Sequence, residues 1–173
     1  MTELEKRADA GDAEAQFALG KMYANGQGVP QDLAKAADLY QKAAAQGHAS
    51  AQNNLGVMYK NGKAAGVPQD YAKACELFAK AAEQGSAVAQ FNLGVMCKNG
   101  WGVPQDDAKA AEWLKKAAEQ GHASAQFRLG VLYENGWGVA KDQTAAREWF
   151  GKACQNGNQD ACREYERLSE AGF

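Results

Sequence analysis

Apolar residues recur along this chain every three to four positions, which is the period of an amphipathic helix. Between residues 36 and 43 the apolar positions include Ala36, Leu39, Tyr40 and Ala43. The same spacing returns at Ala110, Trp113, Leu114 and Ala117. Small residues let neighbouring helices approach closely, and large ones fill the remaining space. The pattern therefore predicts an all-α protein of tightly packed helices.

Glycines indicate that these helices form a repeat. One column of glycines recurs at intervals of 36, 38, 36 and 36 residues, at Gly11, Gly47, Gly85, Gly121 and Gly157. Three further columns run in step with it and begin at Gly20, Gly26 and Gly28. The longer second interval arises because residues 63–65 replace a single loop residue. A fixed period of this length predicts an alpha-alpha superhelix, a right-handed solenoid of about four helix-turn-helix units.

Each unit is expected to contain a helix A and a helix B. Helix A begins with a residue that can cap free backbone N–H groups and ends at Asn-Gly, where glycine accepts left-handed backbone angles. These first residues are Asp12, His48, Ser86, His122 and Asn158. Helix B begins near an aspartate that complements the helix dipole. These aspartates are Asp32, Asp70, Asp106 and Asp142.

The glycine inside each helix A is a second kind of signal. Gly20, Gly56, Gly94 and Gly130 each cost about 1 kcal/mol of helix propensity relative to alanine. A packing reason must offset that cost. We expect a close crossing of two helices that leaves no room for a side-chain carbon.

The repeat predicts a single domain over residues 1–173. Residues 1–10 are expected to form an N-terminal cap from half of a helix B, and residues 157–173 a C-terminal capping helix. The four repeats between them run over 11–46, 47–84, 85–120 and 121–156.

Charge and hydropathy exclude several classes of partner. The net charge is -2, with acidic and basic residues interspersed, so no basic face is available to neutralise phosphates and nucleic acid is not expected. No apolar run approaches the roughly eighteen residues that cross a bilayer, so membrane insertion is not expected. We expect a soluble protein, and a monomer.

The residues of the first unit resemble the Sel-1-like repeat family, which is related to the tetratricopeptide repeats. The matching positions are Ala15-Gln16, Leu19-Gly20, Tyr23, Asn25-Gly26, Gly28-Val29-Pro30-Gln31-Asp32, Lys35-Ala36, Tyr40, Lys42-Ala43-Ala44 and Gln46-Gly47. The resemblance covers nearly the whole chain. It departs at the end, where Tyr165 and Glu166 stand in place of Leu-Gly, as expected of a cap.

The cysteines fall into two pairs. Cys154 and Cys162 are eight residues apart across the turn at residue 158. This spacing resembles that of cysteine-rich bacterial members of the family, which join each helix pair by a disulfide. Cys75 and Cys97 are centred on residue 86, the equivalent turn two units earlier, so we also expect a Cys75–Cys97 bridge if the helices bring the two Cα atoms close enough.

Two alternatives to these bridges stay open. The first is that all four cysteines are buried, reduced thiols. The second is a zinc site, but the sequence has no Cys-x-x-Cys spacing and only two histidines, so no metal is expected. If both bridges form, the chain belongs in an oxidising compartment, either periplasmic or secreted, with its signal peptide removed. Otherwise it is cytoplasmic.

The A helices of a solenoid line its concave face, so their residues that do not pack against helix B are candidates for partner binding. These are Phe17, Lys21, Asn53, Asn54, Val57, Lys60, Phe91, Asn92, Val95, Lys98, Phe127, Arg128, Val131 and Glu134. Valines offer apolar contact, and asparagine amides can bond an extended peptide backbone. Trp101 and Trp137, between loop glycines, are expected as loop contacts or as lids over the core edge. The phenylalanines can equally be interhelical core.

These features predict a non-catalytic scaffold or adaptor that binds another protein or peptide, without a cofactor, in the envelope, in host interaction or as an inhibitor. His48 and His122 occupy helix-start positions, so they are expected to cap helices and not to act as bases. One alternative is β-lactam binding or hydrolysis, as credited to cysteine-rich relatives, although no Ser-x-x-Lys motif supports it. The other is a structural assembly subunit or an engineered array.

Overall fold

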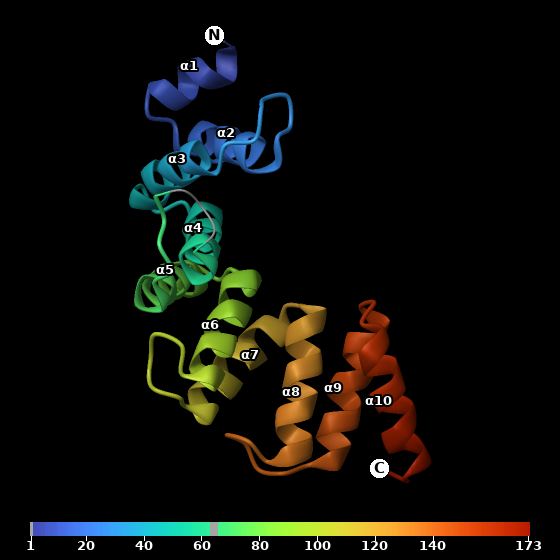
Figure 1. Ribbon diagram of the computed structural model, residues 1–173. Coiled ribbons are helices and arrows are strands. Elements are labelled where there is room, and N and C mark those ends of the chain that lie inside the picture. Colours follow the sequence, from blue (N-terminus) through green and yellow to red (C-terminus); the bar gives the residue numbers. More distant parts are fainter. Residues whose placement is uncertain (1, 63–65) are drawn as a thin grey trace. The chain divides into compact units, whose positions relative to one another are not determined.

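The computed structural model describes residues 2–62 and 66–173 (Figure 1). Within these residues the chain forms ten helices and no β-strand. The helices are α1 Glu3–Asp9, α2 Ala13–Asn25, α3 Leu33–Ala45, α4 Ala49–Asn61, α5 Tyr71–Glu83, α6 Ala87–Asn99, α7 Asp107–Glu119, α8 Ala123–Asn135, α9 Gln143–Gln155 and α10 Gln159–Glu170. The predicted all-α repeat class is confirmed. The predicted loop insertion at residues 63–65 lies outside the described residues.

Helix boundaries follow the capping residues that the sequence indicates. The Asp12 carboxylate accepts a hydrogen bond from the Ala15 backbone N–H at 3.1 Å at the start of α2. At the start of α3, Asp32 accepts from the Lys35 N–H at 3.0 Å. α2 ends at Gly26, whose φ of 68° places it in the left-handed region. Such caps satisfy backbone groups that a helix end leaves without intrahelical partners.

The chain divides into two compact units, Met1–Ser86 and Ala87–Phe173, each with its own core. In unit 1, Ala8, Ala15 and Leu19 form one buried cluster. In unit 2, a cluster that includes Leu114 and Leu129 joins α7 and α8, and another that includes Phe150 and Leu168 joins α9 and α10. The single domain over the whole chain stays a prediction.

The glycine inside each helix A marks a close crossing, as predicted. A Cβ atom placed on Gly20 would lie 2.8 Å from the Tyr40 ring, and one on Gly130 would lie 2.7 Å from the Phe150 ring. Real Cβ atoms essentially never approach other heavy atoms so closely. The propensity lost at each glycine is therefore offset by direct packing of a large side chain on the backbone of helix A.

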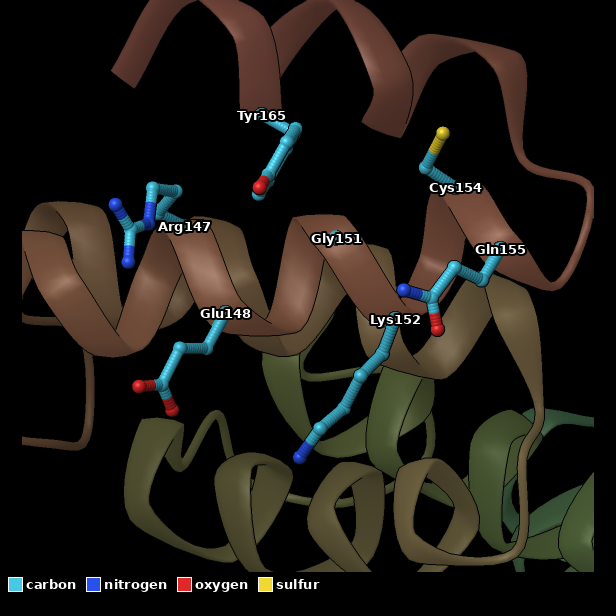
Figure 2. A pocket seen from close by; sticks show the side chains of 7 residues that line it. All are labelled: Arg147, Glu148, Gly151, Lys152, Cys154, Gln155 and Tyr165. Atoms are coloured by element: carbon cyan, nitrogen blue, oxygen red, sulfur yellow. The ribbon is translucent and has the colours of Figure 1, made fainter. Parts of the chain in front are cut away.

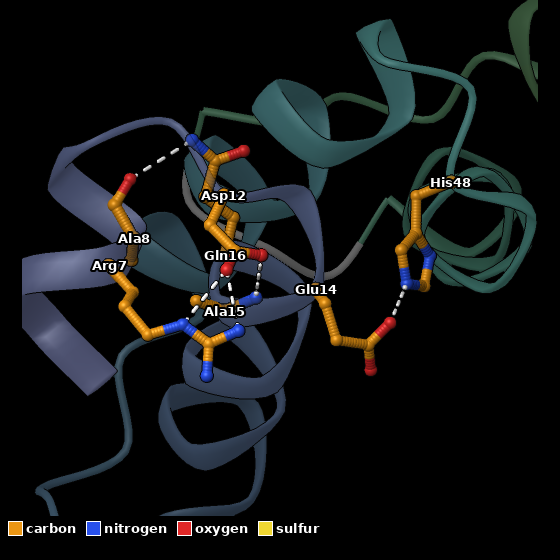
Figure 3. Close-up of polar contacts among 7 residues, drawn as sticks. All are labelled: Arg7, Ala8, Asp12, Glu14, Ala15, Gln16 and His48. Atoms are coloured by element: carbon orange, nitrogen blue, oxygen red, sulfur yellow. Dashed lines mark hydrogen bonds and ion pairs between the residues drawn. The ribbon is translucent and has the colours of Figure 1, made fainter. Parts of the chain in front are cut away.

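A buried glutamine in helix A forms hydrogen bonds with neighbouring helices. Figure 3 shows the first copy, in which the Gln16 amide donates to the Ala8 carbonyl at 3.1 Å. The Gln46 side-chain amide in turn donates to the Gln16 side-chain oxygen Oε1 at 2.9 Å. Gln16 is 4% exposed, so these bonds satisfy polar groups that burial would otherwise leave unpaired. Gln52, Gln90 and Gln126 are buried and hydrogen-bonded at the same position of α4, α6 and α8.

Candidate functional site

An apolar cavity of about 210 Å³ opens in unit 2, lined by residues of α6, α7 and α8 and the loop after α8. It brings together five of the predicted partner-binding residues and one of the two predicted loop contacts, Trp137. The five are Val95, Lys98, Phe127, Arg128 and Val131. Leu114 and Leu132 complete the lining. The cavity is thus the place where the predicted residues converge.

Leu114 lies at the buried side of the cavity, where it is 1% exposed. The equivalent position holds Tyr40 in α3, Phe78 in α5 and Phe150 in α9. All four side chains pack on the glycine of the preceding helix A. Because leucine is shorter than the three aromatic residues, it leaves space beyond itself that a ring would fill.

Unit 1 shows what fills the corresponding space when the residue is aromatic. The Tyr40 ring lies 5.8 Å from the Phe17 ring, between centroids, and its hydroxyl is hydrogen-bonded to Asn54. Burial raises the pKa of that hydroxyl, and the hydrogen bond to Asn54 lowers it in part. In the repeat register Arg128 is the equivalent of Asn54. The guanidinium therefore stands beside the space that a ring tip would reach.

Two cations and an indole border the cavity. The Lys98 ammonium lies 3.0 Å from the Asp107 carboxylate and 4.3 Å from the centre of the Trp137 ring. The Arg128 guanidinium lies 5.7 Å from the centre of the Phe91 ring. Such contacts hold a cation near apolar surface while it stays accessible to solvent. The border therefore carries the Arg128 charge and the Lys98–Asp107 ion pair around an apolar centre.

Trp137 is held in place by the glycine that follows it. A Cβ atom on Gly138 would lie 2.0 Å from the Asp107 carbonyl oxygen, so the loop backbone lies directly against the start of α7. The Trp137 backbone N–H donates to the Leu132 carbonyl at 3.0 Å. Trp137 is 45% exposed and lines the cavity; its role as a loop contact stays a prediction. Trp101 is 39% exposed and does not line this cavity.

A comparison with protein families matches the Sel1 repeat four times, over residues 13–48, 49–86, 87–122 and 123–158. The chain belongs to the Sel1 repeat family. The matched repeats begin two residues after the bounds predicted from the glycine columns, since each starts with the first residue of helix A. A comparison with curated proteins gives no match.

Two solved Sel1-type structures are similar over nearly all of the chain. One is c5321 of uropathogenic Escherichia coli, described as a protective antigen displaying an SLR fold; identity is 42%, the TM-score 0.93, and the match covers 99% of this chain and 36% of that one. The other is a Sel1 repeat protein from Oxalobacter formigenes, with 31% identity, a TM-score of 0.88, and coverage of 98% and 68%. This chain thus spans about a third of the length of the first relative.

A third relative bears on the cysteines. The cysteine rich protein B of Helicobacter pylori is 30% identical, with a TM-score of 0.60, over 76% of this chain and 93% of that one. In the present protein Cys154 and Cys162 form a disulfide with a Cα–Cα distance of 4.7 Å, as expected. The bridge joins the end of α9 to the start of α10.

The expected Cys75–Cys97 bridge is wrong, because both residues are buried thiols. Cys97 takes the position where Tyr59 stands in α4, and there the Lys73 ammonium lies 4.5 Å from the tyrosine ring. The equivalent Lys109, with Asp106, acts electrostatically on the Cys97 thiol. Cys97 therefore faces the start of α7 in its own repeat, whereas Cys75 lies in the core of unit 1. Burial raises the pKa of the Cys97 thiol.

Most of the remaining predicted residues contact other side chains of this chain. The phenylalanine rings contact the next repeat, with Phe17 lying 4.5 Å from the His48 ring and Phe91 4.7 Å from the His122 ring. Lys21 lies 5.6 Å from the Phe17 ring. The remaining half-buried residues are Asn54, Val57, Lys60, Asn92 and Glu134. Glu134 pairs with Arg167 at 2.5 Å.

Asn53 corrects one part of the predicted groove. It is only 9% exposed, and its side-chain amide donates to the Asn54 side-chain oxygen Oδ1 at 3.3 Å. The Asn54 side chain is also bonded to Tyr40. These amides are thus engaged within unit 1 and are not directed to an extended peptide backbone.

Both histidines cap helices, as predicted. The His48 Nδ1 accepts from the Ala51 N–H and the His122 Nδ1 from the Ala125 N–H, both at 3.2 Å. His48 also meets Glu14 at 3.0 Å through Nε2 (Figure 3). Burial lowers the pKa of His122.

A second hollow of about 350 Å³ lies between α9 and α10, near the disulfide (Figure 2). Figure 2 shows Tyr165 of α10 directed toward α9, beside Arg147. A Cβ atom on Gly151 would lie 3.1 Å from the Tyr165 ring, so this glycine admits the ring. Gly151 falls outside the four glycine columns, and that exception was the available sequence signal for this hollow.

In the described part of the chain, no three His, Cys, Asp or Glu side chains come together as a metal site requires. Among the helices of residues 2–62 and 66–173, none has the length and apolar character needed to span a membrane.

Proposed function

We propose that this Sel1 repeat protein is a non-catalytic binding module that holds a segment of another protein against α6 and α8 of unit 2. The observation that carries the proposal is the apolar cavity, which is lined by five predicted partner-binding residues and by the predicted loop contact Trp137. An exposed indole and a neighbouring arginine are the residue types that dominate binding energy in protein interfaces. The cavity supplies both, at Trp137 and Arg128.

The size of the cavity favours a side chain over a cofactor or drug-sized substrate. Pockets for small-molecule ligands usually enclose about 300–1,000 Å³. The cavity of about 210 Å³ is smaller than that range. Its lining consists of apolar side chains and two cations, which suit binding better than acyl transfer from a β-lactam. A protein or peptide partner is therefore proposed, and an enzymatic role is not.

The disulfide supports a location outside the reducing cytoplasm. Structural disulfides persist in the bacterial periplasm and in secreted proteins, whereas cytosolic thiols are kept reduced. The Cys154–Cys162 bridge and the relationship to an antigen of uropathogenic Escherichia coli both fit such a location. We propose that the protein acts in the periplasm or at the cell surface.

A selection of random peptides displayed on phage tests the binding role. Peptides selected on the oxidised, full chain should lose at least about tenfold in affinity to a Val95→Asp variant, because a carboxylate in an apolar site must be desolvated on binding. Val88→Asp is the matched control, since Val88 lies on the same helix but is 49% exposed and does not line the cavity. Circular dichroism should show equal helical content in both variants. Failure to select any peptide, or equal affinity for Val95→Asp and the parent, would remove the proposal.

A further inference from the structure

We infer that the cavity of unit 2 is a socket for one aromatic side chain of the partner, with a carboxylate next to that side chain pairing with Arg128. This inference rests on the proposed function and specifies its ligand. The chemistry follows from a comparison of the repeats within this chain.

The shape of the socket follows from the column that contains Leu114. Three of the four repeats place an aromatic ring at this position, and in unit 1 the ring of Tyr40 reaches Asn54 on the next helix A. In unit 2 the equivalent of Asn54 is Arg128, which lines the cavity together with Leu114. The cavity thus lies in the place that the repeat pattern assigns to a ring, and an incoming ring restores the packing found in the other repeats.

Three aromatic residues in or near the cavity are held in place by other contacts. The Phe91 ring is stacked on His122, with an interplanar angle of 22°. The Phe127 ring forms one wall of the cavity and lies 5.6 Å from the Phe150 ring of the following helix. Trp137 is held by Lys98 and by the backbone approach at Gly138. An occupant must therefore come from outside these packed positions.

Charge selects the neighbour of the ring. Lys98 is balanced by Asp107 at 3.0 Å, and Glu134 by Arg167 at 2.5 Å. Among the salt bridges between described residues, none involves Arg128. The mouth of the cavity therefore carries an excess positive charge at Arg128. A carboxylate beside the inserted ring complements it, and a guanidinium binds a carboxylate through paired N–H groups.

The experiment uses three synthetic peptides with one glycine-serine flank and a central pair: phenylalanine-glutamate, phenylalanine-lysine or alanine-glutamate. Affinity is measured by titration of the ¹⁵N-labelled, oxidised chain, followed through the Trp137 indole signal. The phenylalanine-glutamate peptide should bind best. Alanine-glutamate should be weaker by at least about tenfold because it lacks the buried ring. Phenylalanine-lysine should be weaker by about two- to fivefold, since the ion pair is exposed.

Two variants locate the effect. Leu114→Phe introduces the residue found in α5 and α9, so it should keep the fold while filling the socket, and binding should fall at least about tenfold. Arg128→Asn copies Asn54 of unit 1 and should remove the preference for glutamate over lysine while retaining that for phenylalanine over alanine. Thermal unfolding identifies any variant that has lost its structure. Leu114→Met conserves the side-chain volume and is the control for Leu114→Phe, so it should retain most of the binding.

The outcomes separate this inference from the proposed function. Peptides that bind in a Val95-dependent manner but are indifferent to Leu114→Phe or to ring and charge overturn the socket and leave the binding module intact. Free phenylacetate binding as tightly as the best peptide also overturns it, since the occupant is then a small aromatic acid. Self-association that Leu114→Phe abolishes overturns it in favour of a second copy of this chain.

Discussion

Glycine serves two distinct purposes in this protein, and single residues show the difference. Gly28 and Gly138 have nearly the same φ, 74° and 71°, yet their surroundings differ. A Cβ atom on Gly28 would meet only the flexible end of Met22 at 3.4 Å, whereas one on Gly138 would overlap the backbone of Asp107. Backbone conformation requires the first glycine, and both conformation and contact require the second.

Replacing each of these glycines by alanine should separate the two requirements. Gly28→Ala should cost about 1–2 kcal/mol of unfolding free energy, the strain of a left-handed non-glycine residue. Gly138→Ala should cost clearly more, because the loop must also move away from α7, and the Trp137 fluorescence should shift as its surroundings change. Urea denaturation provides the free energies. Equal losses in the two variants would show that the backbone approach at Gly138 is unimportant.

His122 gives a second prediction at the residue scale, in its dependence on pH. Its neutral ring accepts the Ala125 N–H and stacks on Phe91, and burial lowers its pKa below the ordinary value. A group whose pKa is lowered by folding contributes stability that is complete above its unfolded pKa, about 6.5, and is lost as the pH falls through the folded value.

Unfolding free energies measured between about pH 7.5 and about pH 5 test this contribution. His122→Asn keeps a capping oxygen, as Asn158 does at α10 with a 2.9 Å bond from Ala161, but does not titrate in this range. The variant should therefore lose less stability than the parent as the pH falls. A parallel decrease in the two proteins would contradict the role of the imidazole.

At the scale of the helix, the buried glutamine is the feature that joins successive elements. Gln126 donates to the Ala118 carbonyl of α7 at 3.0 Å and accepts from Asn156, just after α9, at 2.9 Å. It is 4% exposed. The motif Ala-x-Ala-Gln showed where the residue lies in the repeat, but its hydrogen-bond partners on two other helices became visible only in three dimensions.

Gln126→Ala should lower the unfolding free energy by about 1–3 kcal/mol, because it removes both of these hydrogen bonds, which are shielded from solvent at least in part. Asn135→Ala in the same unit is the matched control, since Asn135 makes an exposed bond to the Val131 carbonyl at 2.8 Å. Water can replace that bond, so the control should cost less than about 1 kcal/mol. Chemical denaturation measures both, and similar losses would argue against the burial effect.

The sequence predicts the helices of this protein better than it predicts the candidate site. Capping aspartates and Asn-Gly pairs predicted the helix ends because they act on adjacent backbone. The A-helix positions predicted Val95, Val131 and Arg128 as partner-binding residues. They did not predict the cavity, because it arises from the one column where Leu114 departs from its aromatic equivalents. The prediction of a Cys75–Cys97 bridge was wrong for a related reason, since equivalent positions in the repeat do not fix which neighbour a side chain faces.

At the scale of the whole molecule, covalent stabilisation is uneven. The Cys154–Cys162 disulfide lies entirely within unit 2, while the thiol of Cys75 lies in unit 1 and that of Cys97 in unit 2. A bridge closes a short loop in the unfolded chain and so stabilises the unit that contains it. The two units should therefore respond differently to reduction.

Reduction should lower the stability of unit 2 by about 2–3 kcal/mol and leave unit 1 unchanged. Hydrogen exchange of backbone amides should show faster opening in α9 and α10 but not in α2 and α3. The paired Cys154→Ser and Cys162→Ser variant should behave like the reduced parent, with no further response to reductant, since Cys75 and Cys97 are already thiols. Uniform acceleration along the chain would contradict this account.

The single difference between Leu114 and Tyr40 has an evolutionary consequence. Duplicated copies share a scaffold in which glycine and a facing side chain set the spacing of helices, so a copy can shorten that side chain without refolding its neighbours. A double variant with Tyr40→Leu and Leu114→Phe would fill the cavity of unit 2 and open an equivalent cavity in unit 1. Asn54 would be the neighbour of that cavity in place of Arg128. If the proposed function holds, divergence of one position after duplication is sufficient to give otherwise similar copies different ligands.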